Sequence, residues 1–215
     1  ATPWSSRLAA PVAEGAISHL HRDRPGPDRA AAADLLTRAA LPAESLVLLA
    51  GALKTVPPAE TGKVLPAFDR STDQTVGLKL VESLGDPAVR SVVRVEQVKP
   101  TLDRYPPSVK AAAEKLYAAL AEARRDELTR LDALLKELPA GDVRRGQAVF
   151  NGAKGQCAAC HKIGYVGGLV GPDLTRVGGT RTDRDLLEAV VFPSASFVRS
   201  YEPVRVTTHD GRALN

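Results

Sequence analysis

Methionine is absent from this chain of 215 residues, and cysteine occurs only twice. Aromatic residues make up only 4% of the sequence, a composition that suits packed helices better than a large β-sandwich. No apolar run reaches the ~18 residues that cross a bilayer, so we expect no transmembrane segment. The chain opens with ATPWSS, which is no export leader, and we expect any such signal to have been removed or to lie outside this sequence.

No strong excess of either charge is present. The formal net charge is +4, and the residues up to Gly141 hold 19 Lys and Arg against 18 Asp and Glu. The remainder holds ten against seven, without a basic block and without aromatic residues interleaved among the cations. This pattern argues against a nucleic-acid partner.

The chain has the composition of an ordinary globular protein, with 44% hydrophobic and 25% charged residues. Its length is sufficient for one or two hydrophobic cores. Apolar periodicity interrupted by Pro and Gly predicts short helices, with Asp28 and Asp73 as N-caps, and then one long helix. His19 and His21 are expected to alternate on a helix, as surface residues facing different directions. The predicted helices cover residues 8–20, 29–40, 43–53, 62–68, 74–84, 87–93 and 107–138.

The paired short helices, with the stretch Leu80–Arg90, resemble HEAT-type α-solenoid repeats. The sequence defines no period, and an ordinary helical bundle remains the alternative. Leu138-Pro139-Ala140-Gly141-Asp142 is interpreted as a hinge, because Gly becomes dense beyond it and both cysteines follow. We therefore expect a helical region in residues 1–140 and a second domain in residues 141–215.

The second domain contains the C-x-x-C-H motif Cys157-Ala158-Ala159-Cys160-His161. Two thiols one helical turn apart can form thioethers with the vinyl groups of a haem, and the adjoining imidazole can then bind the iron. The alternatives are a redox dithiol, half of a zinc site and a structural disulfide. The other histidines show no paired spacing for zinc, and no strand precedes Cys157 as a thioredoxin-like site would require, so covalent haem is favoured.

Gly146-x-x-x-Phe150, C-x-x-C-H and Gly171-Pro172-Asp173-Leu174, in this order, resemble a class I cytochrome c domain. Residues 142–215 resemble more closely the haem-binding domain of the Planctomycetes and Verrucomicrobia type, in which a HEAT-like region and a dehydrogenase-like propeller are often joined to it. The fold class expected is therefore mainly α: a HEAT-like array, then a class I cytochrome c-like domain with a short β-hairpin insertion.

The resemblance implies one covalent haem c, held by Cys157 and Cys160 and ligated by His161. The Pro172 carbonyl would accept the His161 Nδ1–H, and this second contact would tune the ligand. Leu174 and Phe150 would pack near the haem. Arg181 would contact a propionate, although a solvated loop arginine is the commoner role for such a residue.

The sequence departs from the class I pattern because it lacks the usual Met ligand and the terminal helix. Residues 201–208 are predicted as a strand and His209-Asp210-Gly211-Arg212 as a hairpin turn, with only three residues left for the return strand, so we expect the domain to be truncated. Three alternatives remain for the sixth ligand: a Met beyond Asn215 or on another segment, His209, or an open position.

The function expected is one-electron transfer in a periplasmic or otherwise exported compartment. The redox partner would be a dehydrogenase domain or an electron carrier. The alternatives are a haem enzyme or a gas or peroxide sensor with an open iron position, and a helical interaction scaffold with an accessory haem.

Overall fold

The structure is a computed structural model that describes residues 7–193, 206–207 and 213–214. The described part is mainly helical, as the composition predicts. Its residues form two compact units: one contains the residues up to Arg125 and the two short C-terminal strands, and the other contains residues 126–193. The boundary falls inside one continuous helix, α8, which ends at Glu137, just before the hinge expected from the sequence.

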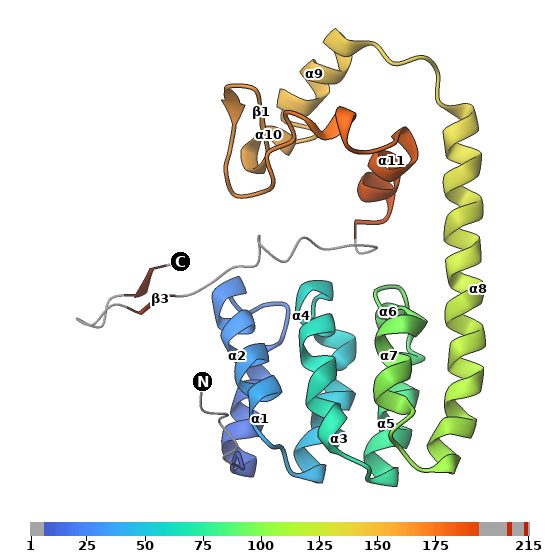
Figure 1. The fold of residues 1–215 in the computed structure, drawn as a ribbon. Helices are drawn as coiled ribbons and strands as arrows, with labels where there is room; N and C mark the ends of the chain where they lie inside the picture. The colour runs from blue at the N-terminus through green and yellow to red at the C-terminus, as the bar shows by residue number, and fades with distance from the viewer. Residues whose placement is uncertain (1–6, 194–205, 208–212, 215) are drawn as a thin grey trace. The chain divides into compact units, whose positions relative to one another are not determined.

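The elements are named as in Figure 1. In chain order they are α1 (Ala10–His19), α2 (Gly26–Arg38), α3 (Ala43–Ala52), η1 (Leu53–Thr55), α4 (Pro58–Val64), η2 (Leu65–Arg70), α5 (Gln74–Leu84), α6 (Pro87–Arg90), α7 (Val95–Leu102), α8 (Pro107–Glu137), α9 (Val143–Asn151), α10 (Cys157–Cys160), β1 (Lys162–Ile163), β2 (Val166–Gly167), η3 (Val177–Gly179), α11 (Asp183–Val191), β3 (Val206–Thr207) and β4 (Ala213–Leu214).

The first unit is a stack of helix pairs. Helix α1 packs on α2 and α3, α3 packs on α5, and α2 packs on α4, so that two rows of helices form (Figure 1). The N-cap residues of the first row are Ala9, Pro42 and Asp73, which are 33 and 31 positions apart (9 to 42 and 42 to 73). The structure thus supplies a near-regular spacing that the sequence alone did not define.

Nearly all the buried apolar residues belong to this first unit. They run from Ala13 to Leu120, and Leu131 is the one buried hydrophobic residue described beyond them. Phe68 and Tyr105 are among the largest of them, and the Tyr105 hydroxyl donates to the Phe68 carbonyl at 3.0 Å. A buried ion pair adds a polar link between α4 and α2, with Glu60 Oε2 3.4 Å from Arg29 Nε.

Several local predictions are confirmed and others are wrong. Asp73 caps α5 by accepting from the backbone N–H groups of Thr75 and Val76. Asp28 is no cap, because α2 begins at Gly26 with Pro25 as its N-cap and Asp28 lies in the first turn. Helix α7 was not predicted, since it is short and carries Pro100 inside.

The C-terminal hairpin expected from the sequence is present as two short strands. β3 pairs antiparallel with β4, with Val206 opposite Leu214 and Thr207 opposite Ala213. The predicted turn at positions 209–212 lies outside the described residues.

Candidate functional site

The two cysteines are the first and last residues of the one-turn helix α10. Residues three apart on a helix share a face, so both thiols project from the same side. Helix α9 packs on α10, and Gly155 makes the close connection possible: a Cβ there would lie 2.7 Å from the Val149 carbonyl oxygen. The turn closes with the Gln156 N–H donating to the Gly152 carbonyl at 3.0 Å, while Gln156 itself has a positive φ of 51°.

His161 ends this helix in an extended conformation, and its ring is held from two sides. Its Nδ1 lies 2.9 Å from the carbonyl oxygen of Pro172. Because a carbonyl can only accept, Nδ1 carries the hydrogen, which leaves the Nε2 lone pair of the neutral ring available to a metal. Gly171 packs against the same ring, since a Cβ there would come within 2.8 Å of Nδ1.

A short hairpin folds back over α10 and fixes this arrangement. β1 and β2 pair antiparallel around Gly164, whose φ is +63°. Three backbone N–H groups beyond Val166 then return to the motif: Gly168 donates to the Ala158 carbonyl at 2.8 Å, Gly171 to that of Cys160 at 2.7 Å, and Leu174 to that of Lys162 at 2.8 Å. The backbone of residues 167–174 therefore wraps around the two cysteines and the histidine.

Glycine is required where this return segment passes the motif. A Cβ on Gly168 would lie 2.2 Å from the Ala159 carbonyl oxygen, and Gly167 has a φ of +115°. Neither the hairpin nor these contacts were predicted from the sequence. The available signal was the alternation in Ile163-Gly164-Tyr165-Val166, with a glycine in the middle.

Asp173 and Thr175 brace the segment that presents Pro172. The Thr175 N–H donates to Asp173 Oδ1 at 2.8 Å, and the Thr175 hydroxyl oxygen accepts from the Gly164 N–H, also at 2.8 Å. Hydrogen bonds from the Thr175 hydroxyl and then from its backbone N–H lower the pKa of Asp173, because they stabilise the carboxylate. The histidine's carbonyl partner thus lies on a segment tied to the β1–β2 hairpin.

The second unit leaves an unusual amount of apolar surface uncovered. Among the described residues from Asp132 to Pro193, no side chain is buried. The exposed fractions are 60% for Val149, 60% for Val166, 76% for Leu169 and 74% for Val170. These residues come from α9 and from the segment that wraps the cysteines, so the apolar surface gathers in the part of the sequence that carries the motif.

The remaining predicted site residues differ in how far they are buried. Phe150 and Leu174 are half-buried, Phe150 on α9 and Leu174 on the return segment. Arg181 is exposed, close enough to Asp185 to help lower the pKa of that carboxyl, which is lowered chiefly by hydrogen bonds from Thr182. His209 lies outside the described residues, so its role as a sixth iron ligand stays a prediction.

The alternative uses of the cysteines receive no support from the geometry. Cys157 and Cys160 are free thiols rather than a disulfide. Within residues 7–193 and the two C-terminal strands, no three His, Cys, Asp or Glu side chains come together to hold a metal, so a protein-only zinc site lacks ligands there. A strand follows α10, whereas a thioredoxin-like dithiol needs a strand before it.

Comparison with protein-family models, with curated proteins and with solved structures finds no match for this chain. In the described part of the chain, no helix combines the length and the apolar character that spanning a bilayer demands.

Proposed function

We propose that the second unit is a cytochrome c-like module that holds one haem c covalently and carries single electrons. The observation that supports it best is the pairing of His161 Nδ1 with the Pro172 carbonyl, which leaves Nε2 as a metal ligand beside two free thiols. A porphyrin brings four nitrogen ligands of its own, so a site with a single protein ligand suits iron in this form.

The residues present fit such a group in three respects. Cys157 and Cys160 lie on one face of α10, as two thioether bonds to one porphyrin require. His161 is held at the end of that helix by contacts independent of any metal. The uncovered side chains of α9 and of the return segment offer apolar surface that a flat, largely apolar group would bury.

Bound haem supplies a reversible one-electron couple, and the role of the chain is to hold and tune it. The Pro172 carbonyl makes the imidazole a stronger donor to iron and fixes its ring plane. Attachment through thioethers requires reduced thiols after export, so we place the mature protein in the periplasm or an equivalent compartment. Its redox partner would be a dehydrogenase domain, in the same polypeptide or another, or an electron carrier.

The first unit is proposed to be a HEAT-like scaffold for this module. The spacing of 33 and 31 positions between successive N-caps and the packing of each first-row helix on the next support a solenoid over a closed bundle. Helices α2, α4 and α6 each carry Pro in the first turn.

The test is expression of the whole chain in a periplasm that contains haem-attachment enzymes. We expect a c-type pyridine haemochrome spectrum and an intact mass raised by one haem. The double variant Cys157→Ser/Cys160→Ser should lose both, whereas Ala158→Ser/Ala159→Ser on the same helix should keep them. A wild-type chain without added mass, or with zinc in place of haem, would overturn the proposal.

A haem enzyme or sensor with an open iron position is the second candidate. It is favoured by one feature: the chain has no Met, and His161 is the single histidine between Asp142 and Pro193. Carbon monoxide separates the two readings, because an open ferrous position binds it at once and shifts the Soret band. A spectrum unchanged by carbon monoxide would leave electron transfer through a six-coordinate haem as the function.

A further inference from the structure

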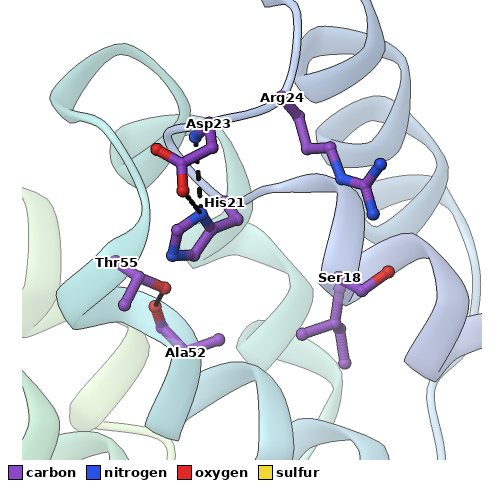
Figure 2. A pocket seen from close by; sticks show the side chains of 7 residues that line it. Ser18, His21, Asp23, Arg24, Ala52 and Thr55 are labelled. Carbon is purple, nitrogen blue, oxygen red and sulfur yellow. Dashed lines mark hydrogen bonds and ion pairs between the residues drawn. The ribbon is translucent and has the colours of Figure 1, made fainter.

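A pocket in the helical unit gathers cationic and polar groups that the haem proposal does not use. Its volume is about 530 Å³, and it is lined by Ile17, Ser18, His21, Asp23, Arg24, Ala52 and Thr55 (Figure 2). The lining comes from the end of α1, from the loop before α2 and from the junction of α3 and η1. His21 was expected on a helix, but α1 ends at His19 and His21 lies in this loop with 44% of its side chain exposed.

The loop that carries His21 and Arg24 is tied to the opposite wall. The Arg22 backbone N–H donates to the Thr55 carbonyl at 3.3 Å, and the Arg22 guanidinium donates to the Lys54 carbonyl at 3.3 Å. The Arg24 carbonyl accepts from the Arg29 guanidinium. These contacts fix the backbone on both sides of the pocket, so that its shape does not depend on a ligand.

The charged groups of the pocket are arranged for an anion. Asp23 Oδ2 lies 3.1 Å from His21 Nδ1, and the second ring nitrogen is turned away from Asp23 (Figure 2). Arg24 lies across from the imidazole in the same view, and no described residue pairs with its guanidinium. Arg24 and Asp23 are the charged side chains of the lining, and the exposed Arg22 and Lys54, which do not line the pocket, add positive charge beside it.

The floor of the pocket has a different character. Ile17 and Ala52 contribute apolar side chains. The Ser18 hydroxyl already donates to the Gly15 carbonyl and the Thr55 hydroxyl to that of Ala52, so both are left as acceptors. The Arg24 guanidinium beside the apolar side chains of Ile17 and Ala52 suits an anion with a small hydrocarbon body better than a fully hydrated inorganic ion.

We propose that this pocket binds a small organic carboxylate, with the Arg24 guanidinium as the principal contact and His21 opposite it. Arginine pairs with carboxylates through two parallel hydrogen bonds, and the apolar part of the ligand would lie on Ile17 and Ala52. The proposal is independent of haem, since every residue it uses lies in the first unit.

The test is titration of the full chain with propionate at constant ionic strength, followed by NMR of the His21 ring. We expect saturable shifts, at least about tenfold weaker binding in Arg24→Ala, and intermediate binding in Arg24→Lys, which keeps the charge but loses the planar fork. Arg104→Ala removes an exposed arginine outside the pocket and should bind as wild type.

Three results would contradict the proposal. One is the absence of saturable shifts with propionate, and another is unchanged affinity in an Arg24→Ala chain whose thermal unfolding matches the wild type. The third is equal competition by inorganic phosphate, which would show a general anion site without a preference for an organic body.

Discussion

Gly77 lets helix α5 approach the segment that leads into α8. A Cβ at this position would lie 2.5 Å from Cδ1 of Tyr105 and less than 3 Å from both methyl groups of Val109. Tyr105 and Val109 are buried, so neither can move aside into solvent. We expect Gly77→Ala to lower the free energy of unfolding by about 1–3 kcal/mol through overpacking, measured by urea denaturation.

Gly62 is the matched control for this substitution. It lies inside helix α4, and no atom is within 4 Å of its virtual Cβ. Ala there should stabilise by roughly 0.5–1 kcal/mol, because alanine loses less backbone entropy on folding than glycine does. If both alanine variants shift the urea midpoint in the same direction, close packing is not the reason why position 77 requires glycine.

Tyr117 is one of two tyrosines whose ionisation the fold resists, since burial also raises the pKa of Tyr105. Its hydroxyl oxygen is buried without a hydrogen-bond partner in the described part, and Lys99 Nζ lies 5.0 Å from the ring centre. Burial raises the pKa of Tyr117 to about 12, and the negative charges of Asp103 and Glu114 add to the effect.

An unfolded tyrosine has a pKa of ~10, and the folded chain raises that of Tyr117. The contribution of Tyr117 to the free energy of unfolding is therefore fully present below pH ~10 and is lost as the pH rises toward 12. Absorbance at 295 nm should show a tyrosine step near pH 12 that is smaller by one tyrosine in Tyr117→Phe, because Tyr105 also ionises above its usual range. The loss of stability between pH 9 and 11 should also be smaller in Tyr117→Phe. A variant with the wild-type alkaline profile would assign the step to another tyrosine.

At the scale of whole elements, the sequence predicts best where a polar side chain marks the start of a helix. Helix α5 has the bounds expected from the sequence, because Asp73 accepts from the free N–H groups of the first turn. Helix α7 was missed because it is short and carries Pro100, and the β1–β2 hairpin because each strand has only two residues. The contacts around His161 were missed for a different reason: Gly168 and Gly171 are explained only once the return segment lies on α10.

The contact between His161 and Pro172 was expected from the resemblance to cytochromes and is present, although the haem itself remains a proposal. The wrong assignment of Asp28 shows that an acidic residue near the start of a helix does not always mark its N-cap. A Pro-Gly-Pro run can begin a helix by its fixed backbone angles alone, and the acidic residue then falls in the first turn.

The cap at Asp73 gives a prediction for helix α5. Its Oδ1 accepts from the N–H of Thr75 at 2.8 Å and from that of Val76 at 3.0 Å. Asp73→Ala should destabilise the protein by about 1 kcal/mol, within the usual 0.5–2 kcal/mol for lost caps, whereas Asp73→Asn should keep most of the stability. Equal losses in the two variants would show that the charge and not the capping oxygen matters. Thermal unfolding followed by circular dichroism is the measurement.

At the scale of the whole molecule, the two units differ in what holds them together. The first has a continuous apolar core built from its own helices, including Leu36, Leu49 and Phe68 with no exposed side-chain surface. In the second, the described residues from Asp132 to Pro193 include no buried side chain, and order there rests on backbone hydrogen bonds around α10 and on polar links such as that between Arg184 and Asp132 at 2.9 Å. Exposed ion pairs contribute little, so the described residues from Asp132 to Pro193 have no apolar core of their own to stabilise them.

This asymmetry predicts that the attached group, once present, supplies the missing core of the second unit. Hydrogen exchange should then show protected amides in α9, α10 and α11 of the haem-loaded protein, and fast exchange of the same amides in Cys157→Ser/Cys160→Ser. Protection of α1–α5 should be the same in both proteins, because the apolar core lies there. Protected amides at Gly168 and Gly171 in the thiol-free variant would mean that backbone contacts alone hold the motif, and that haem is not needed to order this unit.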